Sequence, residues 1–168
     1  MTKYDNIIAI DPDVDKSGVA LLKPATRQLE VTSLSFPQLL DYLKYVKKEH
    51  DKTGETVIVL VEAGWLNKSN WHLRDGDTKR IAGAKGNSTG RNHEVGRKII
   101  ECAAHYGIDV REQIPLRKCW KGKDGKITAN ELASFTGLTG KTNQEGRDAA
   151  LIAWVYADLP IKIKPINQ

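Results

Sequence analysis

Four acidic residues lie far apart in the chain, at positions from which they could meet in the fold. Asp11 ends the apolar run I-I-A-I, and Glu62 ends the run V-I-V-L-V. Glu145 and Asp148 lie three residues apart in the last segment with helical periodicity. Carboxylates suit Mg²⁺, a hard cation that prefers oxygen ligands, and two such ions about 3.5 to 4 Å apart can drive hydrolysis of a phosphodiester. We therefore predict that all four acids are metal ligands and catalytic residues in a site for two Mg²⁺ ions, with Mn²⁺ as an alternative ion.

Some of these acids also have simpler explanations. Asp11 could be an ordinary turn acid, and Asp148 could form an ion pair with Arg147 or another cation. Glu145 is three residues after Thr142, which is the spacing of a capping box at the start of a helix. A metal role for Glu145 therefore competes with a role as a helix cap. The histidines at 93 and 105 are predicted to be surface residues.

Positive charge is concentrated between Gly64 and Lys98. This stretch carries eight lysines and arginines against three acids, so its net charge of +5 equals that of the whole chain. It includes the run A-G-A-K-G-N-S-T-G, whose composition predicts a flexible loop over about 64–90. Basic residues interspersed with tryptophans favour a nucleic-acid contact, and the alternative is a solvated surface loop. The predicted contacts are Lys68, Trp71, Arg74, Lys79, Arg80, Lys85 and Arg91, with Lys118, Lys121 and Lys123 from a second basic group around Trp120.

The apolar pattern predicts the elements that must position the acids. Strands are expected at 7–10, 18–22 and 28–35, followed by a helix that starts after Ser35 and runs to about Glu49. A continuous apolar strand at 56–61 should be central in the sheet and covered on both faces. A helix around 95–106, a strand at 108–114 and two helices capped at Thr128 and Thr142 complete the order βββαβαβαα.

Three motifs carry a resemblance to a known family. The segments I-I-A-I-D-P-D-V-D-K-S-G-V-A-L-L, V-E-A-G-W-L and E-G-R-D-A-A-L-I-A-W resemble, in order, the motifs of the RuvC-type Holliday junction resolvases. The predicted order of elements, a three-stranded meander followed by alternating helices and strands, is the layout of an α/β fold of the RNase H-like type, a mixed five-stranded sheet flanked by helices, and the resemblance implies the same fold. It implies that Asp11 bridges both metals, that Glu62, Glu145 and Asp148 complete the site, and that Lys126 lies near the reacting phosphate. The turn after Asp11 departs from the family, because Asp13 stands where a glycine is usual.

The resemblance also implies a function and partners. It predicts a metal-dependent endonuclease that resolves four-way junctions or other branched DNA, acting as a homodimer through the helix at about 91–106. The alternatives are an RNA-processing nuclease on the same fold and a non-catalytic DNA-binding scaffold. With 168 residues, 40% of them apolar, the chain is expected to form a single domain over residues 1–168. No basic leader with an apolar segment of secretory length is evident, so we expect a cytoplasmic protein that does not bind membranes.

Overall fold

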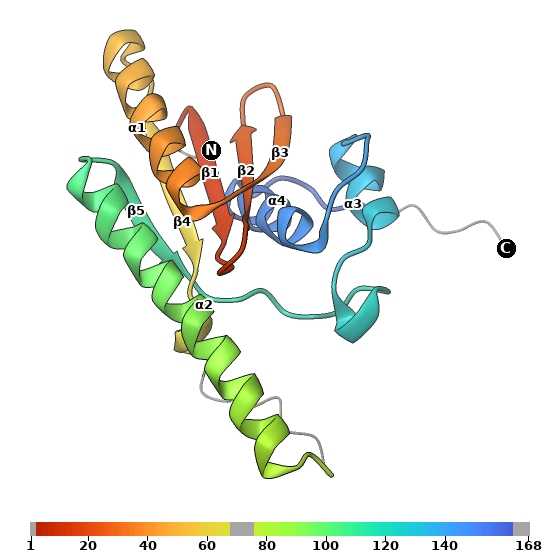
Figure 1. Ribbon diagram of the computed structural model, residues 1–168. Helices are drawn as coiled ribbons and strands as arrows, with labels where there is room; N and C mark the ends of the chain where they lie inside the picture. The colour runs from red at the N-terminus through yellow and green to blue at the C-terminus, as the bar shows by residue number, and fades with distance from the viewer. Residues whose placement is uncertain (1–2, 68–75, 163–168) are drawn as a thin grey trace, which may run out of the picture.

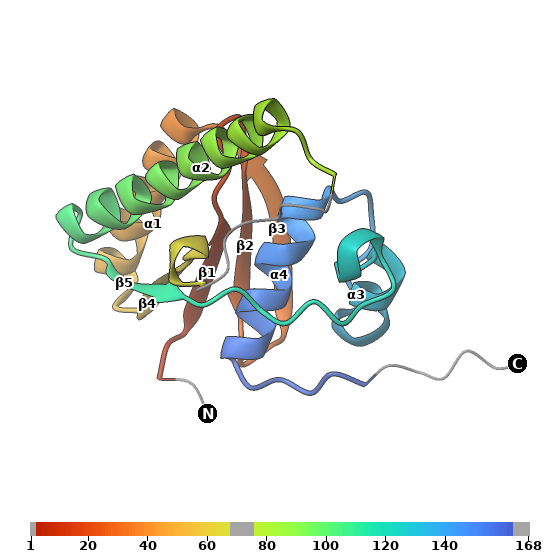
Figure 2. The same cartoon turned by 90° about the horizontal axis from the view of Figure 1, so that it is seen from below.

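A computed structural model describes residues 3–67 and 76–162 of the chain. They form a five-stranded sheet with the strand order β3-β2-β1-β4-β5, flanked by helices on both faces (Figures 1 and 2). The strands are β1 (Asn6–Asp11), β2 (Ser17–Lys23), β3 (Gln28–Leu34), β4 (Val57–Glu62) and β5 (Asp109–Gln113). The main helices are α1 (Phe36–Thr53), α2 (Lys79–His105), α3 (Ala129–Thr136) and α4 (Gln144–Tyr156), with short 3-10 turns η1 (Gly64–Leu66) and η2 (Lys123–Gly125).

The sheet is mixed, and its register sets the position of the site. β1, β2 and β3 form an antiparallel meander, whereas β4 and β5 run parallel to β1. Ile10 lies opposite Val61 in the parallel β1–β4 pair, so both strands end at the same edge of the sheet. This strand order and the alternating helices confirm the predicted RNase H-like α/β fold.

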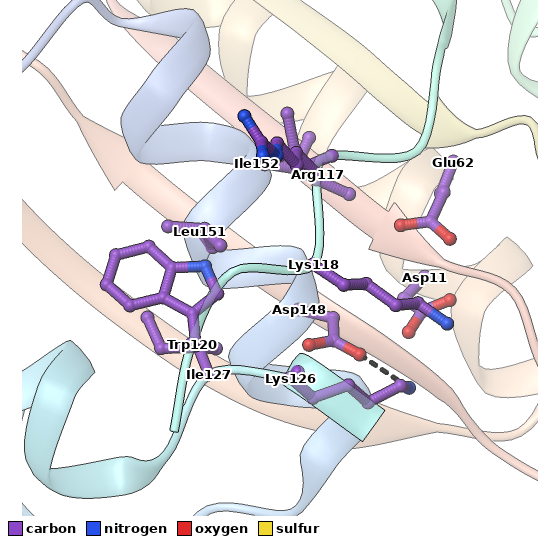
Figure 3. A pocket seen from close by; sticks show the side chains of 12 residues that line it. Asp11, Glu62, Arg117, Lys118, Trp120, Lys126, Ile127, Asp148, Leu151 and Ile152 are labelled. Atoms are coloured by element: carbon purple, nitrogen blue, oxygen red, sulfur yellow. Dashed lines mark hydrogen bonds and ion pairs between the residues drawn. The ribbon is translucent and has the colours of Figure 1, made fainter. Parts of the chain in front are cut away.

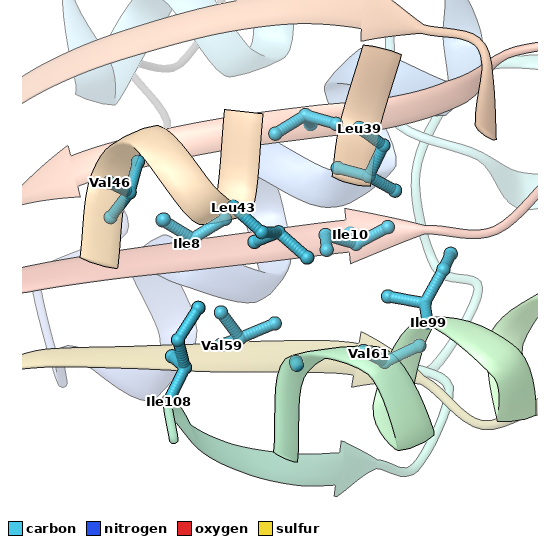
Figure 4. Packing of buried hydrophobic residues seen from close by; sticks show 11 residues of the cluster. Ile8, Ile10, Leu39, Leu43, Val46, Val59, Val61, Ile99 and Ile108 are labelled. Carbon is cyan, nitrogen blue, oxygen red and sulfur yellow. The ribbon is translucent and has the colours of Figure 1, made fainter. Parts of the chain in front are cut away.

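Both faces of the two central strands are buried. Ile8, Ile10, Val59 and Val61 pack with α1 and α2 on one face, as Figure 4 shows. The alternate residues of β1 and β4 pack on the other face against α4, whose Trp154 is among the largest fully buried side chains. Burial on both faces explains why the strand sequences are apolar without alternation, as predicted for central parallel strands.

The helix boundaries match the sequence signals in part. The predicted capping boxes are present at α1, after Ser35, and at α3, where Thr128 accepts from the backbone N–H of Glu131. α1 continues past the predicted end near Glu49 to Thr53, and it stops where Gly54 adopts a left-handed conformation with φ of 74°. The described residues include no helix that is long and apolar enough to cross a membrane.

The largest correction concerns the segment predicted as a flexible loop over about 64–90. Residues 64–66 form a 3-10 turn, and residues 79–90 form the first part of the 27-residue helix α2. The glycines and small polar residues led to the loop prediction, but Thr78 caps the helix by accepting from the backbone N–H of Ile81. The helix then continues without interruption into the packed half that the apolar periodicity did predict.

Candidate active site

Asp11 and Glu62 are held at one edge of the sheet by the pairing of β1 with β4. Each is the last residue of its strand, directly after a buried aliphatic pair. Ala63, the next residue after Glu62, is fully buried, and its N–H donates to the carbonyl of Gln113. The two carboxylates therefore project from rigid neighbouring strands, as predicted.

Asp148 reaches the same edge from α4, and close packing of that helix brings it there. Gly18 lies opposite Asp11 on β2, and a Cβ added to it would lie 2.1 Å from the carbonyl carbon and oxygen of Glu145. Gly146 allows a second close approach, because a Cβ there would lie 2.6 Å from Val31. Glycine at both positions therefore lets the start of α4 lie directly on the sheet beside Asp11.

The three carboxylates line one cavity of about 110 Å³. Figure 3 shows Asp11, Glu62 and Asp148 directed toward a common space, with Lys118 and Lys126 beside them. The floor is apolar, and the basic segment that follows β5 forms the wall opposite the strands. Part of the second basic group of the sequence thus lies at the acid-bearing edge of the sheet.

The carboxyl groups of Asp11 and Glu62 are both shifted toward their neutral forms. Burial raises the pKa of Asp11 well above 3.8, and the charges of Glu62, Asp148 and Glu145 raise it further, while Lys126 opposes the shift. Burial and Asp148 likewise raise the pKa of Glu62, against Lys126 and Lys118. Like charges collected in a poorly solvated pocket oppose their own ionisation, so this site favours the binding of cations.

Lys126 supplies part of that positive charge. Its Nζ donates to Asp148 Oδ2 at 2.8 Å, and the two side chains are only 35% and 16% exposed. Burial would lower the pKa of Lys126, but the hydrogen bond and charge of Asp148, with the charges of Asp11 and Glu62, raise it overall. Gln144 Nε2 donates to the other oxygen of Asp148 at 2.7 Å, so both oxygens of this carboxylate are engaged. Sequence analysis found Lys126 but missed Gln144, which has no distinctive motif.

A divalent metal fits this site by donor chemistry. Carboxylate oxygens are the ligands that Mg²⁺ prefers, and burial together with mutual repulsion raises the pKa values of Asp11 and Glu62, which a bound cation would oppose. Among the described residues, no three acidic, histidine or cysteine side chains are close enough as they stand to hold one ion. Asp148 is instead paired with Lys126. Asp11, Glu62 and Asp148, which line the same cavity, are the residues that would hold a metal there.

Glu145 is placed differently from the other three acids. It is not among the described residues that line the cavity, although its charge contributes to the raised pKa of Asp11. The predicted cap at Thr142 is wrong, because Asn143 is the N-cap and its Oδ1 accepts from the backbone N–H of Gly146 at 2.9 Å. Glu145 therefore lies in the first turn of α4, where a negative charge is favoured by the helix dipole, and its metal role stays a prediction.

A larger groove of about 570 Å³ continues from the acids toward α2. The residues that line this groove include Asp11, Glu62, Trp65, Asn92 and His93. His93, which was predicted to be a surface residue, lines this groove and is half-buried, and its ring meets Trp65 edge-on with the centroids 5.9 Å apart. Burial and the nearby charge of Arg97 lower the pKa of His93. This groove gives an extended substrate a path to the acids.

Asn92 connects α2 by hydrogen bonds to the turn that follows Asp11. Its Oδ1 accepts from the backbone N–H of Val14 at 3.1 Å, and its Nδ2 donates to Asp13 Oδ2 at 3.3 Å. Asp13 Oδ1 also accepts from the backbone N–H of Asp15. The Asp13 carboxylate therefore holds the turn together. Asn92 and Asp13 are 79 positions apart, so only an alignment of related chains could have predicted this hydrogen bond.

The predicted nucleic-acid contacts fall into three groups. Lys118 lines both the acid cavity and the groove, whereas Lys121 and Lys123 are exposed nearby. Four contacts lie on the first half of α2, where Lys79, Arg80 and Arg91 are exposed and Lys85 is half-buried. Lys68, Trp71 and Arg74 lie outside the described residues. Contact of these side chains with nucleic acid stays a prediction.

Comparisons with known proteins give similarity in structure but not in sequence. No family model and no curated protein matches the chain. The structure is similar to that of Thermus thermophilus RuvC in complex with a Holliday junction substrate, with 15% sequence identity, a TM-score of 0.47, and coverage of 92% of this chain and 93% of the other. A second Thermus thermophilus RuvC structure is similar at 16% identity with a TM-score of 0.46, covering 90% of this chain and 93% of that one.

Proposed function

We propose that this protein is a Mg²⁺-dependent endonuclease that cuts four-way junctions or other branched DNA. The observation that carries the proposal is the convergence of Asp11, Glu62 and Asp148, from three separate elements, on one cavity beside two lysines. The preference for branched DNA rests on the ordered resemblance of the three sequence motifs to the resolvases.

Each residue has a defined role in the proposed reaction. Asp11 and Glu62 hold the cations at fixed positions, because each is anchored at the end of a buried strand. Bound metal supplies an activated water and charge stabilisation at the leaving oxygen. Lys126 and Lys118 border the same cavity, and their ammonium groups attract and orient the phosphate. Asp148 completes the anionic site and shares its charge with Lys126.

A homodimer is part of the proposal, because cutting both strands of a junction symmetrically requires two sites. The half of α2 from Arg91 to His105 buries Gly96, Ile99 and Ala103 against its own sheet, and its outer side includes exposed Arg91, Glu94, Lys98 and Glu101. Such a charged surface indicates a polar, salt-sensitive association. Sedimentation at low and high salt tests it, and a monomer at every salt concentration would remove the dimer from the proposal.

The proposal is tested by cleavage of a labelled four-way DNA junction beside matched duplex DNA, single-stranded DNA and RNA. Wild type and Asp11→Asn are compared in Mg²⁺ and in EDTA, with the exposed-acid variant Asp41→Asn as the matched control. We expect paired nicks at the junction that require both Mg²⁺ and Asp11. Metal-dependent cutting of RNA would instead favour an RNA nuclease, and tight DNA binding without cutting would favour a scaffold.

A further inference from the structure

The first half of α2 extends past the edge of the sheet where the acids lie. Figure 1 shows this half continuing beyond the ends of the strands. The buried residues of α2 are Gly96, Ile99 and Ala103, so none of the residues from Lys79 to Val95 is buried. Asn92, which bonds to the turn after Asp11, lies near the point where the helix leaves the body of the protein. Residues 79–91 therefore gain little stability from the core.

The sequence of this projecting half also disfavours an independent helix. It contains Gly83, Gly86 and Gly90, and each glycine in a helix interior lowers the helix equilibrium constant about threefold to fivefold relative to alanine. Lys79 and Arg80 occupy the first turn, which contains no acidic residue, and positive charge is unfavourable there because of the helix dipole. The Thr78 cap and the ion pair between Lys85 and Asp77 oppose these effects. The three glycines and the basic first turn outweigh these two contacts, so the unfolded chain is favoured over the helix for residues 79–91 when no partner is bound.

The same residues are suited to one kind of partner. Between positions 79 and 93 the chain has four lysines and arginines and no acid. The inner side of this segment borders the groove that leads to Asp11 and Glu62, with Thr89 and His93 on the wall. Phosphate groups would neutralise the basic side chains and remove the repulsion at the helix N-terminus.

We infer that residues 79–91 form a DNA-binding arm that becomes fully helical only when it lies along the phosphate backbone next to the acid site. This rests on the proposed function and adds how the substrate is admitted. In free protein the arm exchanges between helix and disordered chain, and DNA selects the helix. Part of the binding free energy is then used to order the arm, so its intrinsic helix propensity sets the affinity for DNA.

Changes in helix propensity that touch nothing else provide the test. A Cβ added at Gly83 or Gly90 would meet no atom within 4 Å, so alanine fits both positions without a clash. In the uncleaving Asp11→Asn background with Mg²⁺, the pair Gly83→Ala and Gly90→Ala should tighten binding to a four-way junction about 10- to 25-fold. Ala84→Gly, at an exposed position of the arm, should weaken binding about threefold to fivefold. Ala104→Gly, exposed in the packed half of the same helix, is the control and should change affinity less than twofold.

Amide hydrogen exchange supplies the independent readout. Residues 79–91 should exchange rapidly in the free protein, and both the junction and the two alanine substitutions should slow that exchange. The inference would be overturned if all variants bound the junction with the same affinity and if the amides of residues 79–91 were already protected from exchange in the free protein. Cleavage by the wild type, measured in parallel, would then leave the proposed function standing. Absence of both junction binding and cleavage would overturn the inference and the proposed function together.

The partner is tested by salt dependence. Replacing Lys79 and Arg80 with alanine should reduce the slope of log affinity against log salt concentration by about one for each phosphate that these side chains neutralise. A slope equal to that of the parent protein would show that the arm does not lie on the DNA backbone and would overturn the assignment.

Discussion

Neutralising Asp11 should stabilise the metal-free protein while abolishing its proposed activity. Burial and three neighbouring acids raise the pKa of Asp11 well above 3.8, so the ionised carboxylate is unfavourable in the folded state. Each pKa unit of such a shift costs about 1.4 kcal/mol of folding free energy. In EDTA at pH 7, Asp11→Asn should therefore raise the free energy of unfolding. Tm should rise as well, by about 2 to 4 °C for each kcal/mol of added stability in a chain of 168 residues.

The direction of the pH dependence follows from the sign of the shift. Below pH 3.8 the carboxyl group is protonated in both the folded and the unfolded state, so it costs nothing. As the pH rises through the raised folded pKa, ionisation penalises the folded wild type increasingly, and the penalty is complete above that pKa. The stability advantage of Asp11→Asn should therefore be small near pH 4 and full at neutral pH.

Thermal unfolding monitored by circular dichroism, with and without Mg²⁺, is the assay. Mg²⁺ at about ten times its dissociation constant should add about 1.4 kcal/mol to wild type and much less to the variant. Asp41→Asn, at an exposed position on α1, should change neither quantity. An Asp11→Asn protein that is less stable than wild type in EDTA would refute the reasoning, because Asp11 would then be making favourable contacts rather than suffering repulsion.

Three further predictions concern a lysine beside the acids, a glycine that allows close packing of α4, and a core leucine away from the site. Lys126→Met should raise the pKa of Asp11 further, because the ammonium of Lys126 opposes the existing shift. The rise of the cleavage rate with pH should therefore move to higher pH. A pH profile equal to that of wild type would show that Lys126 does not influence the ionisation of the acids. Gly18→Ala should destabilise the fold by about 1 to 3 kcal/mol and reduce cleavage, since its Cβ would meet the backbone of Glu145, and a crystal structure would reveal the displaced helix. Leu43→Ala, at a fully buried position away from the acids, should lower the free energy of unfolding by about 2 to 5 kcal/mol in urea titration and leave the activity of the remaining folded protein intact.

The sequence was most informative where a local pattern determines where a residue lies in the fold. The apolar runs before Asp11 and Glu62 are strands buried on both faces, and the parallel pairing of β1 with β4 brings their ends together. Periodicity and strand order therefore sufficed to predict the fold and to place these two acids. Asp148 was also predictable, because it interrupts a helix segment in which Ala149, Ala150 and Ile152 are buried.

The errors arose where composition and local geometry favour different structures. Glycine-rich sequence between 79 and 90 predicts a loop, yet continuity with the packed half of α2 allows a helix there. At the start of α4, both Thr142 and Asn143 are good capping residues, and the pattern alone chose the wrong one. The choice depends on the path of the preceding loop, where the carbonyl of Thr142 accepts from Arg147 Nη1 at 2.6 Å.

An ion pair of Asp148 with Arg147 or another cation was one of the alternatives, but the sequence could not identify Lys126 as the partner, and this pair bears most directly on how the site works. It joins a loop to a helix across 22 residues, and it depends on close packing of α4 against β2 at Gly18. Lys126 limits the repulsion at both Asp11 and Glu62, whereas Lys118 acts on Glu62. If a metal ion replaced Lys126 as the partner of Asp148, the Lys126 ammonium would be left beside the cavity, where a phosphate is the natural anion. Metal binding and phosphate binding would then favour each other. The metal would bind the Asp148 carboxylate and the phosphate would bind the Lys126 ammonium, and these two charges neutralise each other while the ion pair is formed.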